Sequence, residues 1–329
     1  QTSVSDLEKI DQDWVLHTNK GVFHTKQLLL ATGAAESPFP IPGWTLPGVM
    51  SVGAAQVMTN VHRVKPGKRG VIIGVNVLSS AIAMELQIAD VQVAAITLPA
   101  ANLLTINSSN PLEVMNSLLY VSHMAPSPLI KIGSKFMKNE TLKKLGIRIY
   151  PKDGVKMWGI PIMLRKAVIE IVGKDQVEGV VLATVNIDGS IVPGSEKRID
   201  VDFVCIAGGL YPLAELASLA GCPFHYIEQL GGFVPLHNEQ METNLTGLHV
   251  AGNITGIEGA KVALAQGKGA ALTIASKLGS SVSQIDIQQA IENVETTRAN
   301  AHIQFHPEVL VGRQKMKEIW AQTLSHTLS

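Results

Sequence analysis

The chain has 329 residues, of which 46% are hydrophobic, and its 27 Lys and Arg residues balance its 27 Asp and Glu residues. This length favours two domains, and the lack of a basic excess excludes an extended nucleic-acid-binding surface. Neither a signal-peptide pattern nor a clean membrane-spanning run is visible, so we expect a cytoplasmic α/β protein. Cys205 and Cys222 form neither a redox C-x-x-C motif nor a metal-binding pattern.

The first forty residues predict β structure. Two alternating segments flank the turn Asn19-Lys20-Gly21, which is typical of a hairpin. The apolar strand Gln27–Leu30 follows and ends in the small residues Ala31-Thr32-Gly33. Residues 41–66 are rich in proline and glycine and contain a short helical piece, so we interpret them as a linker between domains.

Residues 67–197 predict an inserted unit that opens with a βαβ motif. A strand at Gly70–Ile73, a helix at Val77–Ala89 and a strand at Val91–Ile96 follow one another closely. The later elements that we expect are helices at Pro111–Tyr120 and Ser134–Leu145, a strand at Arg148–Pro151, and an antiparallel pair at Lys166–Val172 and Val177–Val185. The pattern is that of a Rossmann-like α/β domain.

The turn between the first strand and helix of this unit departs from the G-x-G-x-x-G of dinucleotide-binding motifs. Its three positions are held by Gly74, Asn76 and Ser79. Asn76 places a side chain where the backbone should meet a pyrophosphate, and Ser79 adds bulk where helix and strand pack closely. The second strand ends in Thr97-Leu98, without an acid for a ribose. We therefore expect NAD(P) binding to be weak, altered or lost, and a mononucleotide such as AMP or ATP is an alternative ligand.

Residues 198–282 predict a third region in which two strands end in small residues. One ends in Ala207-Gly208-Gly209, and the other in Gly252-Asn253, shortly before a helix at Ala260–Leu278. Ligands of open α/β sheets bind beyond the carboxyl ends of strands, where small residues let the ligand approach the backbone and helix N-termini attract anions. Residues 283–329 predict a helical tail.

Taken together, these segments resemble the two-dinucleotide-binding flavoproteins, the pyridine nucleotide-disulphide oxidoreductase-like family, over about residues 14–280. The stretch "LLLATGAAESPFPIPGWTLPGVMSVGAAQ" is similar to the branch that contains the α subunits of sarcosine oxidase, hydrogen cyanide synthase, opine oxidase and heteromeric proline dehydrogenases. The resemblance implies a Rossmann-like FAD domain, in residues 1–40 and 198–282, interrupted by an inserted NAD(P)-type domain.

The resemblance also implies which residues bind FAD. In the family's second flavin motif a strand ends in Gly-Asp, and Asn253 replaces that acid here with an amide that still donates and accepts hydrogen bonds. The helix that starts near Ala260 would point its N–H groups at the electron-rich edge of the flavin. The implied FAD set is Ala31, Thr32, Gly33, Gly208, Gly252, Asn253, Gly259, Ala260, Lys261 and Val262.

Other features are open to more than one interpretation. His237, just before the second flavin motif, is either a polar group facing flavin or substrate, or a loop histidine with satisfied bonds. The family's G-x-G-x-x-G unit for the FAD pyrophosphate is not in this sequence, so we expect an inactive fragment of a longer chain, or a second chain that supplies the unit. The cysteine cluster that some relatives use for an iron–sulfur centre is also missing from the C-terminal segment.

The resemblance implies an FAD-dependent oxidoreductase, the α-type electron-transfer subunit of an amine or amino-acid dehydrogenase or oxidase. A partner subunit would then oxidise the substrate. Two alternatives stay open: a free-standing NAD(P)H-dependent flavin oxidoreductase with a small acceptor, and a nucleotide-binding regulatory or structural module without turnover.

Overall fold

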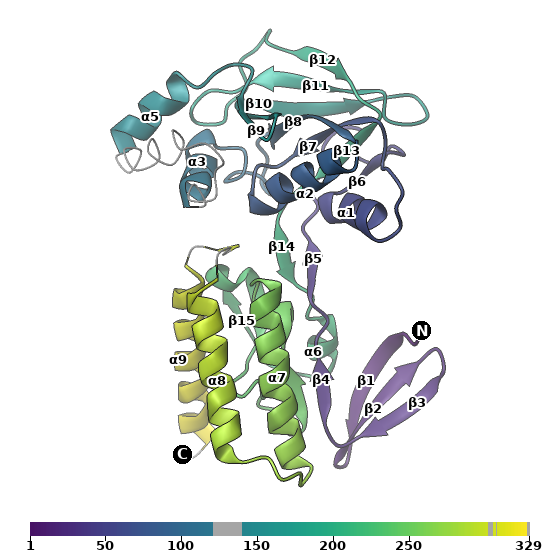
Figure 1. Ribbon diagram of the computed structural model, residues 1–329, viewed down its shortest axis with the longest axis vertical. Coiled ribbons are helices and arrows are strands. Elements are labelled where there is room, and N and C mark those ends of the chain that lie inside the picture. Colours follow the sequence, from purple (N-terminus) through teal and green to yellow (C-terminus); the bar gives the residue numbers. More distant parts are fainter. Residues whose placement is uncertain (121–139, 302–304, 307, 328–329) are drawn as a thin grey trace. The chain divides into compact units, whose positions relative to one another are not determined.

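The computed structural model describes residues 1–120, 140–301, 305–306 and 308–327, and the chain forms two compact units (Figure 1). Unit 1 is built from Gln1–Ala35 and Leu210–Ser329, and unit 2 from Glu36–Gly209. Unit 2 is therefore an insertion in the sequence of unit 1. Sheets and helices occur in both, and the inserted unit has the Rossmann-like parallel sheet that the sequence predicts.

The main sheet of unit 2 has the strand order β12-β11-β10-β8-β7-β13-β6, with β9 paired to β10. Its strands are β6 (Val49–Ser51), β7 (Arg69–Ile73), β8 (Gln92–Pro99), β9 (Val155–Met157), β10 (Ile160–Val172), β11 (Gly179–Thr184), β12 (Lys197–Asp200) and β13 (Phe203–Ile206). Strands β10, β8, β7, β13 and β6 run parallel, and β11 and β12 extend the sheet antiparallel. Parallel strands are covered on both faces, which explains why Val71, Ile72 and Ile73 are all fully buried.

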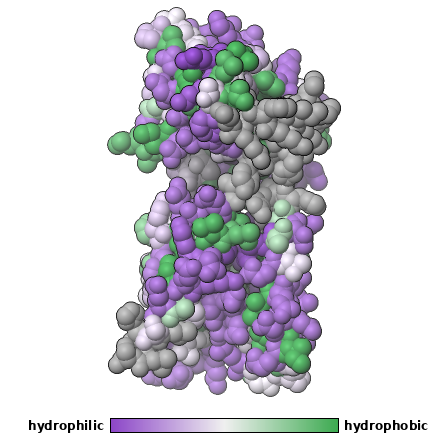
Figure 2. Space-filling model, turned by 90° about the vertical axis from the view of Figure 1, so that its left-hand side faces the viewer, coloured by the Kyte–Doolittle hydropathy of each residue, from purple (hydrophilic) through white to green (hydrophobic). Residues whose placement is uncertain are grey.

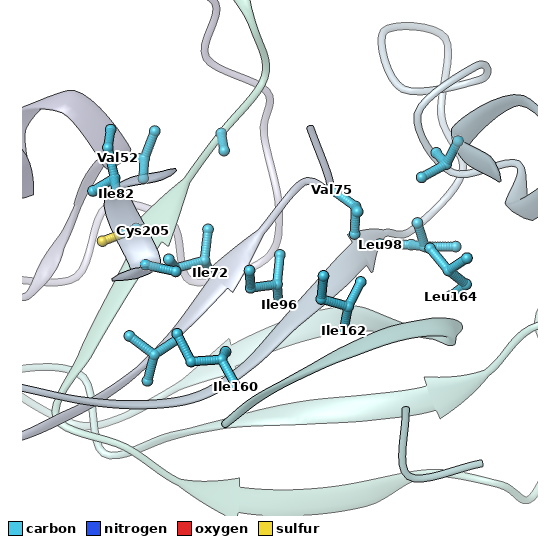
Figure 3. Close-up of a cluster of buried hydrophobic side chains, with 14 of the residues drawn as sticks. Val52, Ile72, Val75, Ile82, Ile96, Leu98, Ile160, Ile162, Leu164 and Cys205 are labelled. Carbon is cyan, nitrogen blue, oxygen red and sulfur yellow. The ribbon is translucent and has the colours of Figure 1, made fainter. Parts of the chain in front are cut away.

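The helices of unit 2 are α1 (Val52–Asn60), α2 (Val77–Ile88), α3 (Pro111–Tyr120) and α5 (Glu140–Arg148). Side chains of α1 and α2 share one hydrophobic core with the sheet, and Figure 3 shows Val52 and Ile82 from these helices in a cluster with Ile72 and Cys205. A second core on the sheet includes Phe39 from the segment before β6. The sheet is thus packed on both faces.

The strands of unit 1 are β1 (Val4–Ile10), β2 (Asp13–Thr18), β3 (Gly21–Thr25), β4 (Leu28–Leu30), β14 (Leu210–Pro212), β15 (Phe224–Ile227), β16 (Gly232–Pro235) and β17 (Leu248–Val250), and β5 (Ala34–Glu36) carries the chain into unit 2. Strands β1, β2 and β3 form an antiparallel meander, in which Thr18 pairs with Gly21 across the hairpin turn. Trp14, 1% exposed, anchors this meander in a core that it shares with β4 and β17.

The helices of unit 1 are the short α6 (Glu215–Leu219), the 3-10 turns η2 (Glu228–Leu230) and η3 (Gly252–Thr255), and the long helices α7 (Ala260–Lys277), α8 (Gln284–Ala299) and α9 (Val309–Thr327). Helix α8 starts with a capping box between Ser283 and Asp286. In the described part of the chain, no helix is both long enough and apolar enough to cross a bilayer. Figure 2 accordingly shows a face on which hydrophobic side chains form separate groups among hydrophilic ones.

Several predicted elements are confirmed. The hairpin at Asn19-Lys20-Gly21, the βαβ motif of β7, α2 and β8, the antiparallel pair β10–β11 and the helix α7 all form where the sequence places them. Helices α8 and α9 occupy the predicted helical tail. Of the helix expected at Ser134–Leu145, residues 134–139 lie outside the described residues, and α5 covers the rest.

Two expectations differ from the structure. The strand predicted at Arg148–Pro151 is wrong, because α5 extends through Arg148 and Tyr150 then turns so that its hydroxyl donates to Ile162 O at 2.7 Å. The compact units also divide at Ala35/Glu36 and Gly209/Leu210, so residues 41–66, which we expected to be a linker, and residues 198–209, which we expected in the FAD domain, belong to unit 2. The reason is hydrogen bonding: β6 and β13, which flank the expected boundaries, pair with each other inside the sheet of unit 2.

Candidate functional site

In unit 1, the strands β4 and β17 end side by side. They run parallel, with Leu28 opposite Leu248 and Leu30 opposite Val250. The pairing continues past the strands, because Ala251 N donates to Leu30 O at 3.1 Å. The loops that follow both strands therefore emerge at one edge, which is where ligands of α/β sheets bind.

The first of these loops, Ala31-Thr32-Gly33, leaves open space above its backbone. Gly33 has φ +83°, and a Cβ added there would meet no atom within 4 Å. The loop is tied to the start of the second unit 1 segment, since Gly33 O accepts from Leu213 N at 3.1 Å and Thr32 Oγ1 donates to Leu213 O. A glycine with a left-handed φ and no neighbour is compatible with close approach of a ligand to the backbone.

The second loop is η3 and the turn that leads into α7. Gly252, with φ +80°, donates its N–H to Gln266 Oε1 at 2.8 Å. Asn253 Oδ1 accepts from Glu258 N at 3.2 Å, and its backbone O accepts from Gly256 N at 3.1 Å. The amide that stands at the acidic position of the flavin motif thus also orders its own loop.

Helix α7 begins at this edge without a side-chain cap among the described residues. Gly259 is its N-cap, Ala260 and Lys261 are exposed, and Val262 is buried at 1% exposure. An uncapped N-terminus has backbone N–H groups without helical partners and the positive end of the helix dipole. Val262 N already donates to Gly259 O at 3.0 Å, so the N–H groups of Ala260 and Lys261 are the donors that an electron-rich ligand can use.

The two helix N-termini beside the parallel strands of unit 2 are occupied by the chain itself. At α1, the Glu36 carboxylate accepts from Ser51 Oγ at 2.6 Å and from Gly53 N at 2.9 Å. At α2, Asn76 Oδ1 accepts from Ser79 N at 2.8 Å, and Ser79 Oγ accepts from Asn76 N at 2.9 Å. Two of the N–H groups that would bind a phosphate at the N-terminus of α2 therefore already donate to side chains of the turn itself.

The glycines near this turn are needed for packing within unit 2. A Cβ on Gly74, which has φ +112°, would lie 2.2 Å from Ala207 O. Asn76 Nδ2 also donates to Ala207 O at 3.0 Å. A Cβ on Gly208 would lie 2.0 Å from Ser37 O. This member of the expected FAD set belongs to unit 2, whereas β4 and β17 belong to unit 1.

The unit 2 turn differs from an NAD(P)-binding motif at the positions that contact the pyrophosphate and the ribose. Its helix start is closed by the Asn76–Ser79 capping box, and β8 ends at Thr97, Leu98 and Pro99 without a carboxylate. Thr97 is fully buried, so its side chain does not reach a ligand at this edge either.

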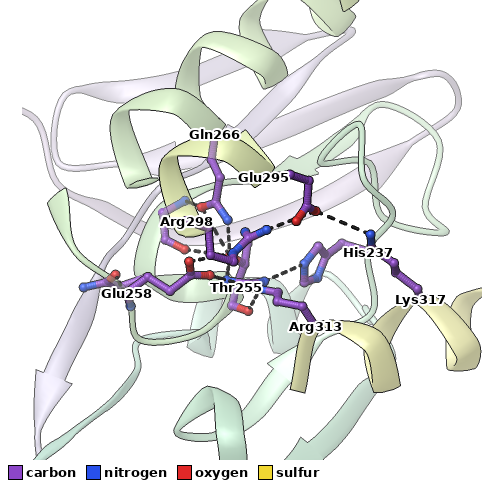
Figure 4. A network of polar contacts seen from close by, with 10 residues as sticks. His237, Thr255, Glu258, Gln266, Glu295, Arg298, Arg313 and Lys317 are labelled. Carbon is purple, nitrogen blue, oxygen red and sulfur yellow. Dashed lines mark hydrogen bonds and ion pairs between the residues drawn. The ribbon is translucent and has the colours of Figure 1, made fainter. Parts of the chain in front are cut away.

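A buried polar network lies behind the α7 loop, and sequence reasoning missed it (Figure 4). The Glu258 carboxylate accepts from Arg298 Nε at 2.8 Å and from Arg313 Nε at 2.7 Å. Arg313 Nη1 also donates to Thr255 O at 2.8 Å. Burial alone would raise the pKa of Glu258, but the charges of Arg313 and Arg298 outweigh it and hold this pKa below its usual value.

His237 is part of this network rather than a free ligand. Pro235 O can only accept, so the hydrogen of the His237 ring lies on Nδ1, 2.7 Å from that oxygen. Nε2 is then an acceptor facing Arg313 Nη1 at 3.3 Å. Burial and the charge of Arg313 lower the pKa of His237 to about 3, so the ring is neutral. Of its two interpretations, the histidine with satisfied bonds is confirmed.

Both cysteines are free and buried, and each packs in a different hydrophobic core. Burial raises the pKa of Cys222 to about 11, and burial also raises that of Cys205. Protonated thiols in separate cores cannot serve as a dithiol redox pair. The sequence argument against a disulphide-reducing C-x-x-C site agrees with this arrangement.

Residues 2–267 match the family model described as pyridine nucleotide-disulphide oxidoreductase. An opine oxidase subunit of Rhizobium meliloti (strain 1021) is 28% identical over 264 residues, which is 79% of this chain and 50% of that protein. Hydrogen cyanide synthase subunit HcnB of Pseudomonas protegens is 26% identical over 254 residues, 77% of this chain and 48% of that protein. The chain thus spans about half the length of the curated relatives that it matches.

Two solved structures share the fold. The L-proline dehydrogenase of P. horikoshii has a TM-score of 0.56 at 16% identity, covering 88% of this chain and 43% of that one. The thioredoxin reductase of T. acidophilum has a TM-score of 0.52 at 20% identity, covering 85% of this chain and 74% of that one.

Proposed function

Because the chain belongs to the pyridine nucleotide-disulphide oxidoreductase family, we propose that the full-length protein is an FAD-dependent oxidoreductase that transfers electrons within an amine- or amino-acid-oxidising complex. The observation that carries this proposal is the edge at which β4 and β17 end side by side, next to the uncapped N-terminus of α7. Loops of small residues and free backbone donors meet there in one unit.

The residues at this edge fit an FAD molecule. Gly33 provides open space beside a left-handed backbone, Gly252 a second such turn, and Ala260 and Lys261 exposed backbone at a helix start. In our proposal, Ala31, Thr32 and Gly33 contact the cofactor from one loop, and Asn253 and Gly259 to Val262 from the other. When bound, FAD would supply the electron-accepting chemistry, while the protein positions it and stabilises negative charge at the α7 N-terminus.

A partner subunit forms part of the proposal. Curated relatives of this chain include proteins named as subunits of opine oxidase and of hydrogen cyanide synthase. We infer that the partner binds and oxidises the amine or amino acid, and that this chain accepts the electrons.

The geometry of unit 2 argues against the alternative in which NAD(P)H reduces a free-standing enzyme. The capping box at α2 and the lack of an acidic residue at the end of β8 differ from the pyrophosphate and ribose contacts of an NAD(P)-binding motif, which supports our proposal over this alternative. A module without turnover is the third candidate, and it predicts a full-length protein that never carries flavin.

One experiment separates the three. The full-length protein is purified with and without its partner subunit, and its flavin absorbance is followed anaerobically. We expect FAD in the full-length protein, bleaching by secondary amines or amino acids only when the partner is present, and little reduction by NADH or NADPH. Rapid reduction by NADH alone would replace our proposal with the reductase, and a protein without flavin under every condition would support the module.

A further inference from the structure

The loop between β17 and α7 is fixed from outside by the two C-terminal helices. Arg313 of α9 donates to Thr255 O at 2.8 Å and to Thr255 Oγ1 at 3.2 Å, and it also bonds Glu258 (Figure 4). Arg298 of α8 bonds the other Glu258 oxygen at 2.8 Å. Both ends of the loop segment from Thr255 to Glu258 are therefore held by guanidinium groups.

The contacts leave the loop little freedom. Gly256 has φ +136°, and a Cβ there would lie 3.2 Å from Arg313 Nη2 and 3.0 Å from a Leu230 side-chain carbon. Thr255 in turn restrains the start of η3, because its Oγ1 donates to Gly252 O at 2.8 Å. Arg313 is 6% exposed and Glu258 is 7% exposed, so water does not replace these bonds. Arg313 thus holds η3 in place together with Gln266, which accepts from Gly252 N at 2.8 Å.

The buried part of this network carries a net positive charge. Arg298 and Arg313 each contribute one positive charge and Glu258 one negative charge, and the ring of His237 is neutral. At the rim, Glu295 also pairs with Arg298 at 3.1 Å, and Lys317 pairs with Glu295 at 3.4 Å and with Glu239 at 2.6 Å. With these rim residues included, three positive and three negative side chains balance, so removing the charge of Arg313 would leave one negative charge in excess near the start of α7.

We propose that Arg313 is a positioning residue for the cofactor loop: its guanidinium fixes η3 and the start of α7 in the conformation that binds FAD, and its charge favours the reduced flavin. This inference rests on the proposed function, because it assumes that FAD binds at the β4–β17 edge. Arg313 and Arg298 lie beyond residue 267, where the match to the family model ends. We call the bonds of Arg298 and Arg313 to Glu258 and Thr255 the clamp. Both arginines of the clamp lie outside the matched region.

The test uses the full-length protein and its FAD. The first variant is Arg313→Met, which removes the guanidinium donors and the charge. Arg313→Lys keeps the charge but loses the planar guanidinium, and Thr255→Val removes one hydroxyl in the loop. Lys317→Met is the matched control, since Lys317 lies one turn further along α9 and pairs with Glu239 and Glu295 rather than with the loop. Thermal unfolding followed by circular dichroism shows which variants are folded.

The readouts are FAD affinity, from titration of the apoprotein, and the flavin midpoint potential, from equilibration with redox dyes. We expect FAD affinity to fall by about tenfold or more in Arg313→Met, as for the loss of hydrogen bonds from a charged donor. The potential should become more negative in Arg313→Met and stay near the wild-type value in Arg313→Lys, whose affinity still falls. Lys317→Met should match the wild type in both.

A folded Arg313→Met protein that binds FAD within about twofold of the wild type at an unchanged potential would overturn the inference. If Arg313→Met does not fold, Arg313→Lys and Thr255→Val decide by the same criterion for affinity. A wild-type protein that binds no FAD would overturn the proposed function itself, and the clamp inference with it. The wild-type titration therefore distinguishes the two failures.

Discussion

Asn76 and Ser79 bond to each other twice across the first turn of α2, with the side chain of each accepting from the backbone N–H of the other at 2.8 and 2.9 Å. Because these bonds use donors that a pyrophosphate would need, we expect the wild-type protein to bind NADH weakly. The double variant Asn76→Gly, Ser79→Ala restores a G-x-G-x-x-A turn and should bind NADH about tenfold more tightly than the wild type, as measured by calorimetric titration.

The control for this experiment is Ser283→Ala, which removes the equivalent capping box of α8. It should cost about 1 kcal/mol of unfolding free energy, as losing a cap does, and leave NADH binding unchanged. Saturable wild-type NADH binding that the double variant leaves at the same affinity would contradict our interpretation of the turn.

Glu258 is the central acceptor of the buried network, so its replacement should destabilise unit 1. Glu258→Gln leaves Arg298 and Arg313 buried without their carboxylate, and we expect a loss of about 3 kcal/mol in the free energy of unfolding by urea. Glu295→Gln is the matched control, since Glu295 is 41% exposed and its loss should cost less than about 1 kcal/mol. If both substitutions lowered the free energy of unfolding equally, the buried Glu258 would contribute no more to stability than the exposed Glu295.

His237 predicts a defined pH dependence of stability. Its pKa is about 3 in the folded chain, against an ordinary value of 6.5, so the unfolded chain takes up the proton first as the pH falls. The lowered pKa of His237 makes its full contribution to the free energy of unfolding above pH 6.5. This contribution decreases by about 1.4 kcal/mol per pH unit as the pH falls towards 3. His237→Gln should reduce this slope in urea unfolding. Above pH 7 the free energies of unfolding of the two proteins should differ by a constant amount. Identical slopes of this free energy against pH below pH 6 would refute the prediction.

Gly33 and Gly74 form a matched pair for testing the two turns. Both have positive φ, but a Cβ on Gly33 meets open space and one on Gly74 would lie 2.2 Å from Ala207 O. Gly33→Ala should cost about 1 kcal/mol, from backbone strain alone. Gly74→Ala should cost about 1–3 kcal/mol more, because the methyl group also overpacks the turn. Calorimetric unfolding measures both.

The same pair separates folding from cofactor binding. In the full-length protein, Gly33→Ala should lower FAD occupancy, measured as flavin absorbance per chain, although most of its stability remains. Full FAD occupancy in Gly33→Ala would argue against Ala31-Thr32-Gly33 as a cofactor loop.

Local patterns predicted the elements whose signals are short-range. The turn Asn19-Lys20-Gly21 and the apolar run of β7 followed by α2 determine their own structure, because turn geometry and hydrophobic periodicity act over a few residues. The membership of β6 and β13 in one sheet was not predictable in this way. Their pairing, Val49 with Val204, joins distant parts of the sequence, and proline-rich flanks gave residues 41–66 the appearance of a linker.

The candidate site was predicted in part for the same reason. The small residues after β4 and β17 are visible in sequence, and the parallel pairing of Leu30 with Val250 brings them to one edge. The clamp was not visible, since Arg298 and Arg313 are separated from Glu258 by 40 and 55 residues and carry no motif. A buried cluster of ion pairs depends on tertiary contacts that no spacing rule encodes. The roles of the expected FAD residues stay predictions.

The insertion of unit 2 between the two segments of unit 1 has a consequence for the order of folding. Leu28–Leu30 must pair with Leu248–Val250, and the entropy of closing so long a loop opposes this pairing while the intervening chain is unfolded. Once unit 2 has folded, Ser37 N lies 3.0 Å from Gly209 O, so the two points where the chain leaves and re-enters unit 1 are already together. On the ribosome, the inserted unit is also synthesised before the second segment of unit 1 emerges. Unit 2 should therefore fold first and hold the two segments of unit 1 close together, so that unit 1 then assembles.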